Sequence, residues 1–308
     1  MPAKLLAVLQ SLLDMTARGT FIAIEGIDGS GKRTQVELLE KALASRGHSI
    51  YPTGFPQYDS WFGKMVGKFL NGELGALDAV DPHFTAMLYA GDRFEAKLTL
   101  QSALDAGTIV LADRYIGSNL AHQVARAPAE KRAEFMAWIE HLEYNIYGLP
   151  RENLILYLRV PPRHAQRLIA RKSARSYTSA KQDILESSLR HLEDAAEMYD
   201  LLSRRPAWAT IECFDATRNA MRPPQEIAAE VLAAVDPVLA AAREKKRYKL
   251  NHEFFRISRQ RTHCDGPSRR SANRTRPPRS ALHRPAWRRK IHAGPHVRAS
   301  RQLRASYR

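Results

Sequence analysis

A glycine-rich segment near the beginning of the chain has the residues and the spacing of a phosphate-binding loop. The apolar run FIAIE leads into it, a helical pattern follows it, and its letters fit G-x-x-x-x-G-K. Glycines let such a loop turn tightly with its N–H groups facing phosphate oxygens, and the lysine adds a positive charge for the β- and γ-phosphates. We therefore predict that ATP phosphates bind at Gly26, Ile27, Asp28, Gly29, Ser30, Gly31, Lys32, Arg33 and Thr34.

The residue after the loop lysine departs from the usual pattern. Loops of this kind commonly have Ser or Thr there, whose hydroxyl binds Mg²⁺, but this chain has Arg33 and only then Thr34. A guanidinium has donors only and cannot ligate a cation, whereas carboxylate oxygens suit Mg²⁺. We therefore expect the carboxylates of Asp28 and Asp113 to hold the metal or its waters.

A second motif with phosphate chemistry ends the apolar run TIVLAD in Asp113-Arg114-Tyr115. A carboxylate at the carboxyl end of a strand can hold Mg²⁺, and an adjacent arginine can bind an acceptor phosphate through two parallel hydrogen bonds. Phosphoryl transfer requires mainly alignment and charge neutralisation, so Lys32, Arg114 and Asp28 are predicted catalytic residues. The guanine signature N-K-x-D does not occur in the sequence, which argues against a GTPase.

The elements that must position these motifs alternate between short apolar runs and longer segments of helical period. The runs FIAIE, TIVLAD, NLILYLRV and ATIECF lack in–out alternation, as expected for parallel strands covered by helices on both faces. We predict an α/β fold of the P-loop NTP hydrolase type, with about five parallel strands flanked by helices and a mobile lid. Residues 181–205 read as one helix, and another follows Pro223-Pro224, with Pro237 as a possible kink.

Charge divides the chain into unlike parts. Of its 48 Lys and Arg residues, 21 lie from Arg243 onward with three acids, which leaves 27 basic and 29 acidic residues before that point. We predict an extension at 1–18, a P-loop domain at 19–242 and a basic, disordered tail at 243–308, since the tail composition cannot bury enough apolar surface to order itself. The chain has two cysteines, and nothing in their positions suggests a disulfide framework or a metal site, so we expect a protein of the reducing cytoplasm. No stretch reaches the ~20 apolar residues of a membrane span, so we expect no membrane partner.

Several motifs together resemble the thymidylate kinase family of nucleoside monophosphate kinases. They are IEGIDGSGKRTQ, FPQYDSWFGKMVGKFLNGELG, LYAGDRFE, DRYIGSNLAHQ, LYLRVPP and RLIARKSARSY, which together extend over about residues 19–237. The resemblance implies transfer of the γ-phosphoryl group of ATP to dTMP with Mg²⁺, giving dTDP and ADP. It also implies a cytoplasmic homodimer.

The resemblance further implies which residues bind dTMP. Tyr89 and Arg93 are four apart on a predicted helix and share a face, where relatives stack an aromatic ring on thymine and donate from an arginine to a base carbonyl. The amide of Asn119 suits an N3–H beside a carbonyl because it offers a donor and an acceptor. The predicted dTMP set is Asp28, Phe55, Tyr58, Tyr89, Arg93, Arg114, Asn119, His122 and Gln123.

Family members take a catalytic arginine either from the phosphate loop or from a lid. The loop of this chain has Gly29 and Ser30 after Asp28 and supplies none. The lid segment contains Arg167, Arg171, Lys172 and Arg175, and we predict that Arg171 or Arg175 closes over the transferring group. Closure would exclude water and prevent wasteful hydrolysis of ATP.

Three alternatives remain open from the sequence. In the first, the acceptor is another pyrimidine monophosphate such as UMP or dUMP, because the sequence does not place the contact to the thymine methyl group. In the second, the protein is a nucleic-acid-binding P-loop ATPase that uses the basic tail. In the third, the protein is an inactive relative, because Arg33 replaces a metal-binding hydroxyl and Gln57 stands where many relatives have an arginine.

Overall fold

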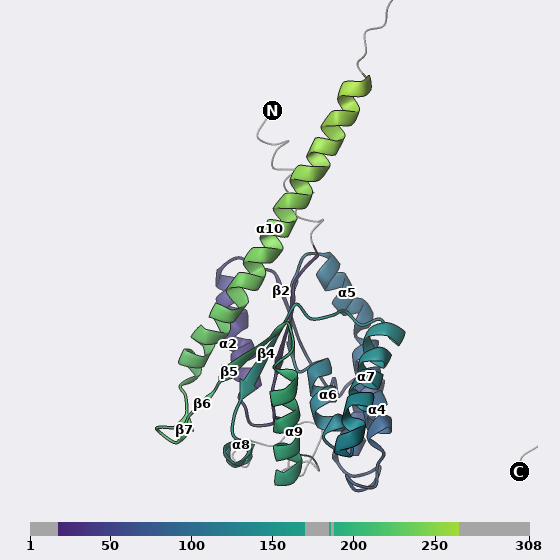
Figure 1. The fold of residues 1–308 in the computed structure, drawn as a ribbon, viewed down its shortest axis with the longest axis vertical. Helices are drawn as coiled ribbons and strands as arrows, with labels where there is room; N and C mark the ends of the chain where they lie inside the picture. Colours follow the sequence, from purple (N-terminus) through teal and green to yellow (C-terminus); the bar gives the residue numbers. More distant parts are fainter. Residues whose placement is uncertain (1–17, 170–184, 186–187, 265–308) are drawn as a thin grey trace, which may run out of the picture. The chain divides into compact units, whose positions relative to one another are not determined.

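A five-stranded parallel sheet forms the centre of the protein. The structure, a computed structural model, describes residues 18–169, 185 and 188–264 (Figure 1). The strand order is β2-β3-β1-β4-β5, with every neighbouring pair parallel. The strands are β1 (Phe21–Glu25), β2 (Ile50–Gly54), β3 (Ile109–Asp113), β4 (Leu154–Arg159) and β5 (Trp208–Glu212), and a small antiparallel hairpin joins β6 (Phe214–Asp215) to β7 (Ala220–Met221).

Helices cover both faces of this sheet, as the uninterrupted apolar strands predict. Helices α2 and α10 lie on one side and α5, α6 and α9 on the other (Figure 1). The helices are α2 (Lys32–Ser45), α3 (Trp61–Leu70), α4 (Pro82–Glu95), α5 (Lys97–Asp105), α6 (Ile116–Val124), α7 (Arg132–Glu140), α8 (Pro162–Ile169), α9 (Leu189–Leu202) and α10 (Pro224–Cys264), with a 3₁₀ turn η1 (Ala129–Lys131) and a π-helical segment η2 (His141–Ile146).

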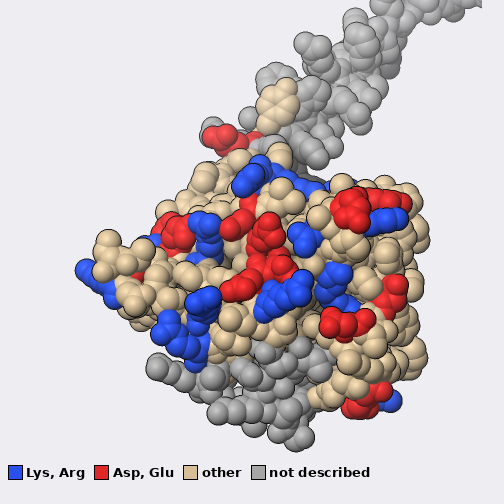
Figure 2. Space-filling view, turned by 60° about the horizontal axis from the view of Figure 1, so that its bottom comes forward, with Lys and Arg blue, Asp and Glu red and all other residues tan. Residues whose placement is uncertain are grey.

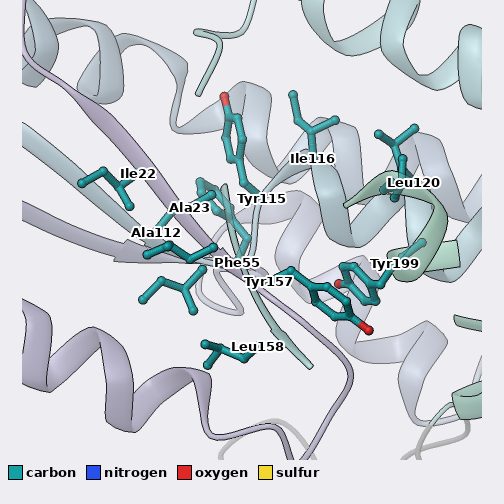
Figure 3. Close-up of a cluster of buried hydrophobic side chains, with 14 of the residues drawn as sticks. Ile22, Ala23, Phe55, Ala112, Tyr115, Ile116, Leu120, Tyr157, Leu158 and Tyr199 are labelled. Carbon is teal, nitrogen blue, oxygen red and sulfur yellow. The ribbon is translucent and has the colours of Figure 1, made fainter. Parts of the chain in front are cut away.

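The core is built where β1, β3 and β4 meet the helices. All five residues of β1 are buried, and aromatic rings fill the space toward α6 and α9. The rings of Tyr157 and Tyr199 stack with centroids 5.2 Å apart, and Figure 3 shows them beside Phe55 and Tyr115. Burial of this apolar surface is the main force that fixes the strands next to one another.

Two helices differ from the sequence-based expectation. Helix α9 begins at Leu189, where Ser188 caps it by accepting from a backbone N–H, and the predicted start at residue 181 lies outside the described residues. Helix α10 passes through Pro237 and continues to Cys264, beyond the stretch 226–248 in which the sequence pattern predicts a helix. Within the described residues, no helix is long and apolar enough to cross a membrane.

The carboxyl ends of the strands bring the predicted motifs to one edge of the sheet. Ile24 of β1 is opposite Asp113 of β3, and Gly54 of β2 is opposite the same residue. The phosphate loop after β1, the Asp113-Arg114 turn after β3 and the loop after β2 therefore leave the sheet side by side. Parallel α/β sheets bind ligands at this edge.

Candidate active site

The phosphate loop joins β1 to the first turn of α2. Gly29 has a φ of +84°, and a Cβ at this position would collide with the carbonyl oxygen of Ala165. Lys32 is buried at the start of α2, and its Nζ donates to the carbonyl oxygens of Gly26 and Ile27 at 2.9 Å each. The first turn of α2 has no side-chain cap, so its N–H groups face the loop, as an anion-binding helix terminus requires.

Arg33 and Thr34 lie on the solvent side of helix α2, away from the loop. The side chain of Arg33 is 88% exposed, and its Nε lies 3.2 Å from Oε1 of Glu37 one turn later. Thr34 is also exposed. Arg33 therefore pairs with Glu37 along the helix, and it offers no hydroxyl to a metal where the usual pattern has one.

Arg114 projects from the turn after β3 toward the phosphate loop. Its backbone has a φ of +67°, in the left-handed region that non-glycine residues rarely adopt. Its Nη2 donates to Oδ1 of Asp28 at 2.7 Å, and its Nη1 donates to Oγ of Ser118 at 2.9 Å and to the carbonyl oxygen of Gly26 at 3.2 Å. Burial lowers the pKa of Arg114, but Asp28 and neighbouring acidic groups raise it by more, so its pKa lies well above the usual value and the guanidinium stays charged.

Glu25, the last residue of β1, accepts hydrogen bonds that hold the turn between β3 and α6 in place. Its Oε1 accepts from the backbone N–H groups of Tyr115 at 2.7 Å and Ser118 at 3.0 Å. Its Oε2 accepts from the hydroxyls of Ser118 at 2.6 Å and Tyr199 at 3.0 Å. Helix α6 has no cap from its own N-cap residue, Tyr115, so a carboxylate from another strand satisfies the N–H groups that a helix start leaves open.

A pocket next to Arg114 has the dimensions of a small-molecule site. It encloses about 460 Å³ of empty space, including open solvent at its mouth. The loop after β2, α3, α4 and α6 supply most of its walls. Its lining residues are Asp28, Pro56, Tyr58, Leu70, Tyr89, Arg114, Ser118, Asn119, His122, Gln123 and Leu185. The N–H of Gln57 donates to both carboxylate oxygens of Asp92 at 3.1 Å, which ties the loop that carries Tyr58 to helix α4.

One wall of the pocket carries an amide whose oxygen has no partner. Nδ2 of Asn119 donates to the carbonyl oxygen of Ala86 at 3.1 Å and to Oε1 of Glu143 at 2.7 Å. Its Oδ1 is buried without a hydrogen bond from any part of the protein that the structure describes. A buried acceptor of this kind is costly unless a ligand satisfies it.

Arg93 does not line the pocket. Its side chain is 1% exposed, and its Nε and Nη2 donate to Oε2 and Oε1 of Glu143 at 2.6 and 2.7 Å. Arg93 and Tyr89 lie on the same helix α4, but only Tyr89 reaches the pocket. The resemblance assigns the guanidinium of Arg93 to a base carbonyl. In the structure, this guanidinium instead binds the carboxylate of Glu143, 50 residues along the chain.

Gln123, on α6, is oriented by two donors, one on α4 and one just after the end of α6. Its Oε1 accepts from the hydroxyl of Thr85 at 2.6 Å and from Nη1 of Arg126 at 2.9 Å. Arg126 also donates to the carbonyl oxygens of Leu77 and Val80, which fixes the loop before α4. With its oxygen occupied, the amide of Gln123 has its Nε2 left to offer to the pocket.

His122, in the pocket wall, pairs with a second buried histidine on α9. Nδ1 of His122 lies 3.2 Å from Nε2 of His191 on α9, and Nε2 of His122 lies 3.4 Å from Nη1 of Arg114. Burial lowers the pKa of His191 to about 4, with a further contribution from Arg126, and burial and the charge of Arg114 lower the pKa of His122 well below its usual value. Both rings are therefore neutral at pH 7.

The two predicted metal ligands have different surroundings. Oδ1 of Asp113 is buried without a hydrogen-bond partner among the described residues, which fits a Mg²⁺-bound water as its missing donor. Asp28 accepts from Arg114 and lines the pocket. Among the described residues, no three His, Cys, Asp or Glu side chains gather as a metal cage. Mg²⁺ is usually bound by one or two carboxylates with waters and substrate phosphates, and these two residues fit that pattern.

Apart from Arg93, the residues predicted to bind dTMP or to form the lid fall into three groups in the structure. Seven line the pocket, namely Asp28, Tyr58, Tyr89, Arg114, Asn119, His122 and Gln123. Phe55 is buried against Tyr115, with ring centroids 5.8 Å apart, and supports the loop instead of lining the pocket. The predicted lid arginines, Arg171 and Arg175, lie outside the described residues.

Sequence reasoning missed the residues that hold this site in shape. Each of these residues contacts a lining residue or its loop: Glu25, Glu143, His191 and Asp92 from distant positions in the chain, and Arg126 from three residues beyond Gln123. Glu25 had one usable signal, since it is the only charged residue of the apolar run FIAIE and directly precedes the loop. His191 and Glu143 had none, because each lies on a polar helical segment that gives no sign of its partner.

Acidic and basic side chains are mixed on one face of the part of the chain that the structure describes (Figure 2). On the face turned forward in Figure 2, acidic side chains gather beside Lys and Arg. The chain before Arg243 has 27 basic and 29 acidic residues, so this part of the molecule lacks the electrostatic footprint of a nucleic-acid-binding domain.

Comparison with known proteins gives one consistent family. The sequence model of the family described as "Thymidylate kinase" matches residues 24–217. A thymidylate kinase of Mycobacterium tuberculosis (strain H37Rv) is 37% identical over 140 residues, which is 45% of this chain and 65% of that protein. The aligned part of the chain thus spans just under two thirds of that relative. A probable thymidylate kinase of Pyrobaculum calidifontis is 31% identical over 224 residues, 72% of this chain and 99% of that protein.

A solved structure of thymidylate kinase from Candida albicans has the same fold. It superimposes with a TM-score of 0.56 and 18% sequence identity, over 72% of this chain and 93% of the other. With the family model matched across the phosphate loop, the pocket and the strands, the chain belongs to the thymidylate kinase family.

Proposed function

We propose that the protein is a thymidylate kinase, which transfers the γ-phosphoryl group of ATP to dTMP and releases dTDP and ADP. The observation that carries the proposal is the pocket itself. Arg114 stands at the end of the pocket beside the phosphate loop, and the unpartnered Oδ1 of Asn119 lies in its wall. A nucleoside monophosphate presents a dianion at one end and a base at the other, which matches this pair of groups.

The phosphate end would align the two reacting groups. The loop N–H groups and Lys32 bind the β- and γ-phosphates of ATP, and Arg114 binds the phosphate of dTMP. An oxygen of that phosphate attacks the γ-phosphorus as the bond to the bridging oxygen of ADP breaks. The positive charges of Lys32 and Arg114 offset the charge that crowds together in the transition state, and their pre-organised geometry is the main source of catalysis.

Mg²⁺ fits this site beside the carboxylates of Asp28 and Asp113. When bound with ATP, the ion would neutralise phosphate charge and orient the γ-phosphoryl group. The protein's own contribution is the buried Oδ1 of Asp113, which can accept from a metal-bound water. Arg171 and Arg175 remain the proposed lid residues for the transition state.

The base end favours a pyrimidine that carries a hydrogen on N3. Asn119 offers its Oδ1 to N3–H, Gln123 offers its Nε2 to a base carbonyl, and Tyr89 provides a ring for stacking. Thymine and uracil both present N3–H between two carbonyls, so kinases for dUMP or UMP are the close alternative. We assign dTMP because the family match supports it over the others.

A coupled ADP-release assay with ATP, Mg²⁺ and a panel of monophosphates tests the proposal. We expect kcat/KM for dTMP to exceed that for dCMP and AMP by at least about 100-fold, because a site that binds a donor through a buried acceptor rejects bases lacking that donor. Equal turnover of all acceptors, or hydrolysis of ATP that ignores them, would refute it.

We further propose that the protein acts as a homodimer in the cytoplasm. Exposed apolar side chains gather on the contacting helices α3, α4 and α5, namely Trp61, Phe84, Met87, Phe94 and Leu98. Such side chains commonly mark interfaces between copies of a chain. Light scattering coupled to size-exclusion chromatography should give twice the chain mass, and a monomer at micromolar concentration would contradict the dimer.

A further inference from the structure

The amide of Asn119 is held in one of its two possible orientations. Flipping an amide by 180° exchanges its oxygen and nitrogen, so only its neighbours decide which faces a ligand. Here two acceptors from different elements surround Nδ2, namely the carbonyl oxygen of Ala86 on α4 and Oε1 of Glu143 on η2. Oδ1 is then the group left for a ligand to bind, and it is buried without a hydrogen-bond partner among the described residues.

Glu143 is suited to enforce this orientation because it can only accept. Both of its oxygens receive hydrogen bonds from the guanidinium of Arg93, at 2.6 and 2.7 Å, and the side chain is fully buried. A carboxylate in such a fork has no proton to donate, so it repels an amide oxygen and binds an amide NH₂ group.

The cost of this ion pair supports a role other than stability. Burying two charges removes them from water, and a buried pair commonly adds less stability than well-packed apolar side chains would. Glu143 also lies in a π-helical segment, and π-helical turns occur often at functional sites. The pair is therefore better explained by the group that it orients.

We propose that Glu143 is a positioning residue that selects the acceptor base. By fixing Oδ1 of Asn119 toward the pocket, Glu143 makes the site accept a hydrogen bond from N3–H of thymine or uracil. Cytosine has a lone pair on N3 and would face the oxygen of Asn119 with a second acceptor. The inference rests on the proposed function, since it assigns the base discrimination of that same pocket.

The variant Glu143→Gln tests the inference with a matched control. Arg93 donates to both carboxylate oxygens, so glutamine points its NH₂ group at Arg93 in either orientation. In the orientation that places the NH₂ group at Oε1, it also faces Nδ2 of Asn119, and rotation of the Asn119 amide relieves this second conflict. We expect the ratio of kcat/KM for dTMP to that for dCMP to fall at least tenfold. The same change at Glu152, which accepts from Tyr144 at 2.7 Å away from the pocket lining, should leave the ratio unchanged. A folded Glu143→Gln protein with the wild-type ratio would overturn the inference.

A measurement on the wild-type protein keeps the inference testable if Glu143→Gln does not fold. Asparagine labelled with ¹⁵N and ¹³C reports the side chain of Asn119 directly by NMR, with its signals identified by their loss in Asn119→Ala. On addition of dTMP, the ¹³Cγ signal should shift as Oδ1 accepts from the base, while the NH₂ signals keep their positions and slow exchange. An NH₂ shift without a ¹³Cγ shift would show the opposite orientation and overturn the inference.

These two experiments separate failure of the inference from failure of the proposed function. If the wild-type protein does not turn over dTMP at all, the kinase assignment fails, whatever the NMR shows. If the wild-type protein does turn over dTMP, but the ratio of kcat/KM for dTMP to that for dCMP is the same in Glu143→Gln and Glu152→Gln, only the role of Glu143 fails.

Discussion

Replacing Glu25 with glutamine tests whether a buried carboxylate holds Arg114 in place. Glu25 is fully buried and accepts four hydrogen bonds, two from the backbone at the start of α6 and two from hydroxyls. Glutamine has nearly the same shape and keeps one acceptor oxygen. Its NH₂ group, however, faces the hydroxyls of Ser118 and Tyr199, which must turn round to accept.

The magnitude follows from the kind of bond that is lost. A hydrogen bond to a charged group contributes about 1.5–3 kcal/mol and a neutral one about 0.5–1.5 kcal/mol. The two backbone bonds would therefore weaken by about 1 kcal/mol each, for a loss of about 2 kcal/mol in the free energy of unfolding. For a domain of this size the melting temperature should fall by about 4–8 °C.

The same variant should weaken binding of the acceptor more than binding of ATP. Ser118 connects Glu25 to Nη1 of Arg114, so a loosened turn misplaces the guanidinium. We expect the KM for dTMP to rise about tenfold, equivalent to about 1.4 kcal/mol, with little change in the KM for ATP. Tyr199→Phe removes only one donor and should give about half the loss of stability. Glu25→Gln with wild-type melting temperature and wild-type KM for dTMP would refute the reasoning.

Three further predictions concern the histidine pair, Arg114 and the tail. His191 takes up a proton near pH 6.5 when unfolded but only near pH 4 when folded, so the unfolded state binds more protons between these values. Stability should therefore fall as the pH drops through this range, by on the order of 3 kcal/mol, and urea denaturation of His191→Asn should show a flatter pH profile; an unchanged slope would contradict this. Arg114→Lys should lower kcat/KM for dTMP about 100-fold, because one ammonium cannot reach both Asp28 and Ser118; steady-state kinetics with less than a threefold loss would argue against it. Truncation after Cys264 should leave dTMP turnover within about twofold while removing salt-dependent DNA binding by the full chain; loss of turnover would give the tail a catalytic role.

The sequence predicted those parts of the fold and site whose signals are local. The phosphate loop, the Asp113-Arg114 turn and the parallel strands each lie in a short contiguous segment, and the spacing of their residues follows from backbone geometry. The shared edge of the sheet then brings Asp28 and Arg114 together, as the register of β1 and β3 shows.

The sequence could not predict contacts that depend on how distant elements pack. Arg93 was expected at the base because it shares a helix face with Tyr89, but its fork is turned to Glu143, which approaches from η2. The contact between His122 and His191 likewise depends on the packing of α6 against α9, because the two residues are 69 positions apart in the sequence. Helix α10 continues to Cys264, beyond the predicted helical stretch 226–248, into a basic segment whose sequence shows no apolar period.

The acceptor panel is the measurement that tests the central claim most directly. Purified protein, ATP and Mg²⁺ are assayed for ADP release with dTMP, dUMP, UMP, dCMP, AMP and GMP. The pocket, with Arg114 at one end and the oxygen of Asn119 in its wall, predicts strong turnover of dTMP, weaker turnover of dUMP and UMP, and almost none of dCMP, AMP or GMP. Turnover of dCMP equal to that of dTMP, or no turnover of any monophosphate, would contradict the account.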